Sequence, residues 1–103
     1  MDPLHSENTK ILIDALLSLQ DQGECERFLE DLLTLQELTA IGQRIRVADM
    51  LSKGYTYETV VKTTGASTAT ISRVNRCLRY GQGGYAKILE HLKEKEEKGN
   101  DGA

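Results

Sequence analysis

Apolar residues recur every three or four positions along most of this chain, the spacing of helices that bury one face. The clearest example begins at Thr34, which is followed three residues later by Glu37 in the pattern of a capping box. We predict a long helix from Thr34 to about Lys53, stopped by Gly54. Its expected core face is formed by Leu38, Ile41, Ile45, Ala48 and Leu51.

The other segments also predict helices, and none has the alternating pattern of a strand. Two helices are expected before the long one, the first capped by Asn8 or Thr9 and the second covering 24–33. A glycine-containing break near the end precedes an expected helix over 85–95. The polar segment 96–103 is expected to be disordered. The predicted fold class is therefore all-α.

A helix-turn-helix is expected at 54–80, around the sequence TGASTATISRVNRCL that starts at Thr64. Gly65 suits the turn, and Ser67 suits the N-cap of the second helix because its hydroxyl can accept a hydrogen bond from a free N–H of the first helical turn. A first helix is expected directly upstream, where Val60 and Val61 are apolar. The second helix is predicted over 67–78.

The second helix has two contrasting faces when its residues are spaced at 100° intervals. The face around Ile71 carries Ser67, Val74 and Leu78. The opposite face carries short or cationic side chains, which a helix needs in order to enter the major groove of DNA. We predict DNA contacts from Ser67, Thr68, Ala69, Ser72, Arg73 and Arg76. The alternative for the whole segment is an ordinary amphipathic helix with a solvated basic face. For Arg73 alone, the alternative is an ion pair within the chain, with Asp49 or Glu58.

The charge distribution favours the DNA-binding interpretation, although the 103-residue chain has a net charge of −3. Residues 1–43 carry a net charge of −7, residues 44–80 carry +5, and residues 81–103 carry −1. A basic block between acidic ones is typical of a DNA-binding face on an otherwise acidic protein. The acidic N-terminal part is expected to face away from DNA because it repels phosphate.

Residues 1–53 are expected to form a dimerisation core, followed by the DNA-reading part at 54–80 and the helix at 81–95 within one domain. The N-terminal helices are apolar on more than one side. This apolar surface is larger than a single small domain can cover. A homodimer is therefore expected, and a three-layer monomer is the alternative. In a dimer, two recognition helices can read adjacent major grooves about 34 Å apart.

Several other classes of protein are not expected. His5 and His91 lack neighbours at ligand spacing, so no metal site is predicted. No catalytic set of side chains or phosphate-binding loop is present in the sequence, so no enzyme is predicted. Two isolated cysteines and the lack of a targeting or membrane-spanning segment favour a cytoplasmic protein with reduced thiols. Cys77 is expected to be a packed thiol.

The run from Glu37 to Leu78, above all GQRIRVADMLSKG and TGASTATISRVNRCL, is similar to the Trp repressor superfamily. It is closer still to the TrpR-like YerC/YecD family of Gram-positive bacteria, and the likeness extends from about Leu12 to Lys95. The resemblance implies an all-α, intertwined homodimer with interlocking N-terminal helices. It also implies a DNA-reading head around Gly65 and a role in transcriptional repression.

The resemblance also locates a possible ligand pocket, which in the Trp repressor binds tryptophan. Thr34, Arg44 and Arg73 match residues that line it. Val74 and Cys77 depart from the family at the same place, where the repressor has a glycine and a serine. The valine adds volume and the thiol is a weaker hydrogen-bond partner, so tryptophan is not expected to be the corepressor and no cofactor is predicted.

The DNA face departs from the repressor as well, because Glu58 and Val61 occupy positions where the repressor carries cations. A different operator is therefore expected. The leading hypothesis is a homodimeric regulator, acting as a repressor on a palindromic operator. The alternative is a protein-interaction module whose acidic N-terminal half binds a partner such as a transcription-complex subunit. The sequence leaves open the operator, the regulated genes and the existence of an effector.

Overall fold

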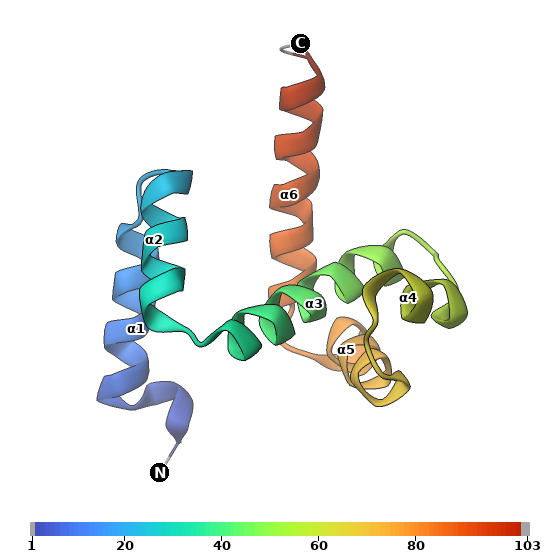
Figure 1. The fold of residues 1–103 in the computed structure, drawn as a ribbon, viewed down its shortest axis with the longest axis horizontal. Coiled ribbons are helices and arrows are strands. Elements are labelled where there is room, and N and C mark those ends of the chain that lie inside the picture. Colours follow the sequence, from blue (N-terminus) through green and yellow to red (C-terminus); the bar gives the residue numbers. More distant parts are fainter. Residues whose placement is uncertain (1, 102–103) are drawn as a thin grey trace. The chain divides into compact units, whose positions relative to one another are not determined.

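The computed structural model describes residues 2–101, and this part of the chain is helical with no strand, which confirms the all-α prediction (Figure 1). A short 3-10 helix precedes six α-helices. Their bounds are η1 Pro3–His5, α1 Glu7–Ser18, α2 Gln22–Leu32, α3 Leu35–Ser52, α4 Tyr57–Thr64, α5 Thr68–Tyr80 and α6 Gly84–Asp101. No helix in this range is long and apolar enough to span a membrane.

The chain divides into two compact units, Met1–Leu38 and Thr39–Ala103. The first, here the N-terminal unit, holds α1, α2 and the first turn of α3. The second, here the C-terminal unit, holds the rest of α3 together with α4, α5 and α6. The boundary between these units lies before the predicted division at residue 53. The C-terminal half of α3 packs with α4 and α5 into a shared core, which places the boundary earlier.

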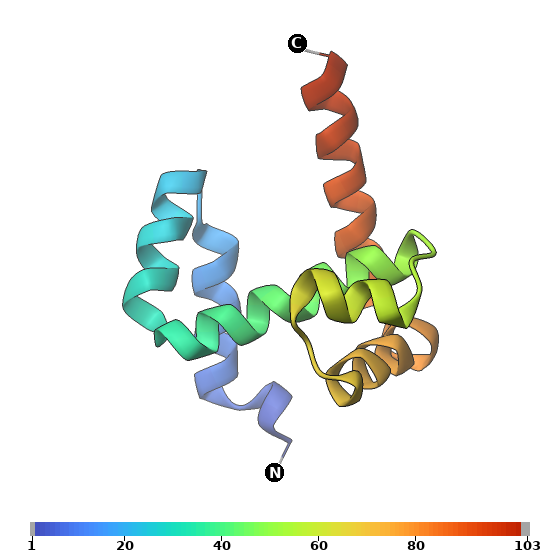
Figure 2. The same cartoon turned by 45° about the vertical axis from the view of Figure 1, so that its right-hand side comes forward.

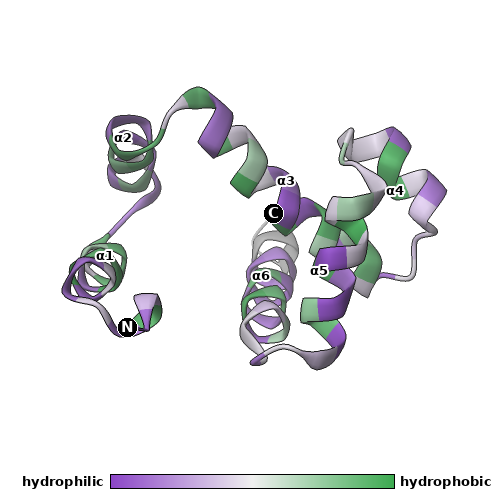
Figure 3. Cartoon of the chain, turned by 90° about the horizontal axis from the view of Figure 1, so that it is seen from below, coloured by the Kyte–Doolittle hydropathy of each residue, from purple (hydrophilic) through white to green (hydrophobic). Residues whose placement is uncertain are grey.

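The first two helices begin earlier than predicted. Ser6 caps α1, because its hydroxyl accepts a hydrogen bond from the N–H of Thr9, and Asp21 caps α2 in the same way through Glu24. Helix α1 leaves its apolar residues largely exposed, including Ile11 at 70% and Leu17 at 80%, whereas in α2 Leu32 is exposed and Phe28 and Leu29 are half-buried (apolar residues are green in Figure 3). The excess of apolar surface expected from the sequence is therefore present in the N-terminal unit.

The capping box at the start of α3 is confirmed. The backbone N–H of Thr34 donates to Glu37 Oε1 at 2.9 Å, and the N–H of Glu37 donates to Thr34 Oγ1 at 3.1 Å. The first of these bonds stabilises the ionised carboxylate and so lowers the pKa of Glu37 from its ordinary value.

The predicted core face of α3 is correct only in part. Ala48 is buried and Leu51 packs against the core. Leu38, Ile41 and Ile45 are exposed by roughly 40%. The buried side chains of α3 are instead Val47, Ala48 and Met50. The reason is that the core of the C-terminal unit forms on the C-terminal half of α3, whereas periodicity marks the whole length of an apolar face.

The core of the C-terminal unit is small and joins three helices. Val60 from α4, Ala66 from the turn, and Ile71 and Val74 from α5 are buried with the three residues of α3. Helices α4 and α5 lie next to each other in both ribbon views (Figure 2). Of the predicted apolar face of α5, Ile71 and Val74 are buried and Leu78 is half-buried, while Ser67 is exposed at the helix start.

Helix α6 is longer than predicted, because it continues to Asp101, and the expected disorder of 96–103 is wrong for 96–101. Residues 102 and 103 lie outside the described residues. Opposite charges four residues apart, at Lys93 and Glu97 and at Glu94 and Lys98, support a helix even where no apolar face is present. At its start, Tyr85 and Leu89 pack against the core.

The break between α5 and α6 requires glycine at position 81. A Cβ atom on Gly81 would lie 2.4 Å from the carbonyl oxygen of Cys77, to which the Gly81 N–H donates at 2.9 Å. That carbonyl belongs to the backbone and cannot move aside cheaply. The glycine-containing break predicted from the sequence is thus a close backbone approach at this residue.

Gly65→Ala should lower the free energy of unfolding by about 1–2 kcal/mol, because Gly65 has a left-handed backbone. Its φ is 74°, and the nearest atom to an added Cβ is Gln43 Nε2 at 3.8 Å, so the cost is conformational and not steric. Urea denaturation at one protein concentration measures this. Gly84→Ala is the control, since nothing lies within 4 Å of its Cβ position. Equal effects from the two substitutions would contradict this account.

Candidate nucleic-acid interface

The turn between α4 and α5 is fixed by short-range hydrogen bonds. The Thr64 hydroxyl donates to the carbonyl of Val60 at 2.7 Å and accepts from the N–H of Ala66 at 3.1 Å. Gly65 caps α4 by donating its N–H to the carbonyl of Val61 at 2.9 Å. The methyl group of Ala66 is buried in the core, so the turn is anchored on its inner side.

Ser67 caps α5 as predicted. Its hydroxyl accepts from the N–H of Thr70 at 3.1 Å and lies 3.1 Å from the hydroxyl of Thr70, to which it can donate. This position satisfies one of the free N–H groups at the start of the helix. The side chain of Ser67 is exposed at the start of α5, while its hydroxyl is used in the capping hydrogen bond.

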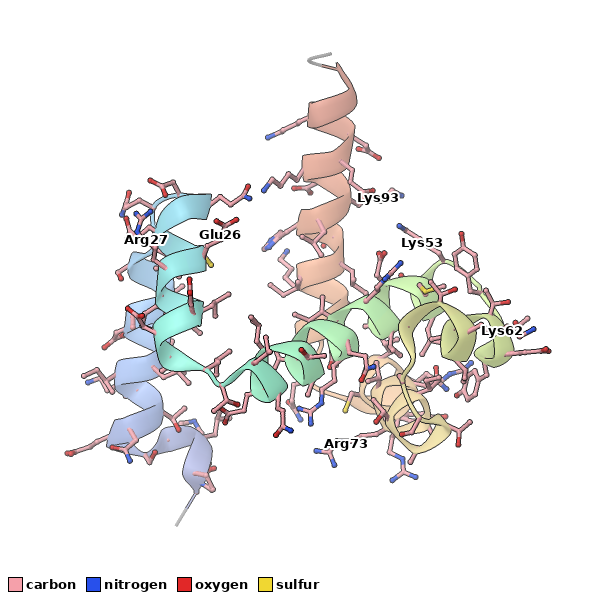
Figure 4. The ribbon with its side chains drawn as sticks, viewed as in Figure 1. Glu26, Arg27, Lys53, Lys62, Arg73 and Lys93 are labelled. Carbon is pink, nitrogen blue, oxygen red and sulfur yellow. The ribbon has the colours of Figure 1, made fainter. Side chains whose placement is uncertain are left out.

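The structure brings the predicted DNA-contact residues together on the outer face of α5. Burial of Ile71 and Val74 fixes the rotation of the helix, and the side chains on the other face are consequently exposed. These are Ala69, Ser72, Arg73 and Arg76, and Thr68 is exposed beside them in the first turn of the helix. Figure 4 shows Arg73 projecting outward from α5. We refer to these five residues, together with Ser67, as the α5 outer face.

The arginines of the α5 outer face are not neutralised within the chain. None of the ion pairs between residues 2 and 101 involves an arginine. The acids once considered as partners for Arg73 pair elsewhere, Asp49 with Lys53 at 3.1 Å and Glu58 with Lys62 at 3.2 Å. The hydrogen bond from Lys53 to Asp49 raises the pKa of the Lys53 ammonium. The cationic face is therefore free to meet an anion.

The first helix of the motif presents a different surface. Glu58 and Lys62 are both exposed on α4, and Lys62 projects outward in Figure 4. Their pairing reduces the repulsion that Glu58 alone would exert on a phosphate. The exposed surface of α4 is consequently less cationic than that of α5.

The residues of the possible ligand pocket are distributed over both units. Thr34 belongs to the N-terminal unit, where its hydroxyl accepts the capping hydrogen bond of Glu37. Arg44 and Arg73 are exposed on the C-terminal unit. Val74 lies in the core, where its side chain fills space that a glycine would leave open.

Cys77 is exposed, so the prediction of a packed thiol is wrong. It lies beside an open apolar groove with Ile45, Tyr85 and Ile88. The centre of the buried face of α5 lies near Ile71, and Cys77, six residues later, is rotated by about 120° from Ile71 and so lies at the side of the helix.

One residue of the site gives no signal in the sequence. The side-chain amide of Gln43, on α3, donates to the carbonyl of Thr64 at 3.0 Å. Its partner is 21 residues away, and a single glutamine on a helix has no pattern that reveals so distant a contact. Among the described residues, no group of three or more potential metal ligands is found.

Two short helices joined by a tight turn, the second with a free cationic face, define a helix-turn-helix protein. The comparison with known families gives the same class. Residues 7–93 match the Trp repressor protein family, and the chain belongs to this family.

The relatives are bacterial proteins of similar length. The chain is 47% identical over 96 residues to the uncharacterized protein YerC of Bacillus subtilis (strain 168), a match that covers 93% of this chain and 92% of that protein. Two solved structures each superpose with a TM-score of 0.83 over 87% of this chain. One is a proposed Trp repressor from Staphylococcus aureus, 43% identical and 90% covered. The other is a TrpR-like protein from Eubacterium eligens ATCC 27750, 46% identical and 93% covered.

The two roles of Ser67 can be separated by substitution. Ser67→Ala should lower the free energy of unfolding by about 1 kcal/mol through loss of the cap, whereas Ser67→Asp should keep the cap and the stability. The aspartate also places a negative charge beside the arginines and should strongly reduce DNA binding. Urea denaturation and fluorescence anisotropy measure the two effects. Wild-type DNA affinity in a stable Ser67→Asp protein would place the interface elsewhere.

Proposed function

We propose that this protein is a sequence-specific DNA-binding regulator that represses transcription by occupying a palindromic operator as a homodimer. The observation that carries the proposal is the α5 outer face. Two of its six residues are arginines without a partner in the described chain, and the other four are short enough to let the backbone approach a base edge. Membership of the Trp repressor family supports the same function.

The α5 outer face divides into two roles by side-chain chemistry. Thr68, Ala69 and Ser72 lie nearest the start of the helix and can contact base edges through a methyl or a hydroxyl group. Arg73 and Arg76 follow and can either form a bidentate pair with guanine or hold phosphates. We therefore assign sequence reading to the first turns and a mixed role to the arginines.

The homodimer is supported by apolar surface that the single chain leaves uncovered. Ile11, Leu17 and Leu35 are exposed by 70%, 80% and 79%, and further apolar side chains of α1 and α3 are exposed by roughly 40%. A surface of this kind is typical of an interface between copies. Two copies related by a two-fold axis would present two recognition helices to adjacent major grooves, which matches a palindromic site.

DNA binding in this proposal does not depend on tryptophan. Val74 fills the space at the position where the Trp repressor has a glycine, and the exposed thiol of Cys77 stands where that protein has a hydroxyl. The site therefore lacks features that suit an indole and its amino group. The expected cytoplasmic location is part of the same proposal.

Selection from random duplex DNA, near physiological salt and without added ligand, should recover a palindrome whose half-sites are about one helical turn apart. Ser72→Ala and Arg76→Ala should each weaken binding to that site by about 5- to 100-fold, because each removes a group that reaches DNA. Arg27→Ala is the matched control, since Arg27 is an exposed arginine of α2. Unchanged affinity in both α5 variants, folded and dimeric, would contradict the assignment of the recognition helix.

The affinity for DNA should fall steeply as salt rises, because cations that meet phosphates displace condensed counterions. With four to six phosphate contacts in a dimer, the logarithm of the binding constant should fall with a slope of about −4 to −5 against the logarithm of salt concentration. Anisotropy titrations between low and physiological salt measure this slope. A flat response would favour the alternative, in which the acidic N-terminal unit binds a protein partner.

A further inference from the structure

Among the described residues of the C-terminal unit, one long-range hydrogen bond joins α3 to the helix-turn-helix, in addition to the local backbone bonds of the connecting loop. Gln43 Nε2 donates to the carbonyl oxygen of Thr64 at 3.0 Å, across 21 residues of sequence. Every other side-chain or non-helical backbone hydrogen bond found between residues 2 and 101 joins residues at most six positions apart. The ion pairs in this range are equally local.

The accepting carbonyl of Thr64 lies at the junction between α4 and the turn of the helix-turn-helix. Thr64 is the last residue of α4, and the last carbonyls of a helix lack partners within the helix. The carbonyl end of a helix is also the negative end of its dipole, so an amide donor is favourable there. Directly after Thr64 comes Gly65, in the left-handed conformation that starts the turn into α5. The bond from Gln43 therefore joins α3 to the base of the recognition helix.

The remaining contacts between α3 and the motif are apolar. Val47, Ala48 and Met50 pack with Val60 and Ile71, and no buried polar or charged residue is present in the described core. Apolar burial is non-directional and tolerates small rotations of one helix against another. A hydrogen bond weakens steeply when its angle changes. Apart from the local backbone bonds of the loop that joins α3 to α4, the half-buried Gln43 thus supplies the directional restraint found in the described chain on the angle of α4 and α5 relative to α3.

We propose that Gln43 is a positioning residue that sets the angle at which α3 presents α4 and α5, and thereby the sequence specificity of DNA binding. The part concerning DNA rests on the proposed function. Base reading by side chains as short as those of Thr68, Ala69 and Ser72 leaves little reach to correct a tilted helix. A small change of angle would then remove base contacts while the arginines still reach phosphates.

The angle can be measured without DNA. Residual dipolar couplings of backbone amides report the orientation of α3 relative to α4 and α5 in solution. In the wild-type protein one alignment tensor should fit all three helices, and in Gln43→Met, which keeps the length but removes the donor, α4 and α5 should require a separate, smaller tensor. A single tensor with the wild-type orientation in Gln43→Met overturns the proposal, whatever the protein binds.

The consequence for DNA is a loss of discrimination. Gln43→Met should reduce the ratio of affinities for the selected site and an unrelated duplex by about tenfold or more, with affinity for the unrelated duplex within about twofold of wild type. An unchanged ratio overturns the role in specificity. If the wild-type protein selects no DNA, the proposed function fails, and the dipolar couplings still decide whether Gln43 sets the angle.

Gln43→Glu supplies a second readout. The variant keeps the shape of glutamine, but its carboxyl group can donate to the Thr64 carbonyl only when it is protonated. The helix orientation should therefore return toward wild type as the pH falls through the pKa of the new carboxyl, while the wild-type protein shows no such change. A flat profile contradicts the proposal. Gln36→Met, the same change at an exposed position of α3, is the matched control and should leave the orientation unaltered.

Discussion

The burial of a few apolar side chains on α3 determines the rest of the C-terminal unit. Ile71 and Val74 of α5 share this core with Val47 of α3 and Val60 of α4. Because side chains of a helix are fixed relative to one another, the burial of these two forces the opposite side of α5 into solvent. The outward direction of Ser72 and Arg76 is therefore a consequence of core packing, and no separate interaction is needed to expose them.

Acidic and basic residues are separated along the chain, which explains how an acidic protein can present a cationic surface. All the charged residues that give the net charge of −7 over residues 1–43 lie in the N-terminal unit, while residues 44–80 carry +5. Within the C-terminal unit, Asp49 and Glu58 pair with lysines, which leaves the arginines of α3 and α5 without an ion-pair partner in the described chain. At physiological ionic strength, charges more than about 8 Å away are largely screened, so the local excess matters more than the total.

Local signals in the sequence predicted the local structure well. The capping box at Thr34, the left-handed turn at Gly65 and the cap at Ser67 all involve partners within four residues, so their patterns contain the whole interaction. Features that depend on distant partners were missed. Periodicity marked Leu38 and Ile41 as core but could not show that the helices of the core reach only the later half of α3. The polar composition after Lys95 led to a prediction of disorder, although opposite charges four residues apart favour the continuation of α6.

In the candidate site, too, the contact that the sequence could not predict is a hydrogen bond between distant residues. The described core has no buried polar groups, so apolar side chains alone determine which helix faces pack together. The positions of these side chains can be read from the sequence. Side-chain packing selects the angle between those faces only to within about 15–20°. A directional contact restrains that angle further, and among the described residues the hydrogen bond from Gln43 to Thr64, which spans 21 residues, is such a contact. The class of the protein can therefore be predicted from the patterns in its sequence, whereas the angle between its helices is visible only in the fold.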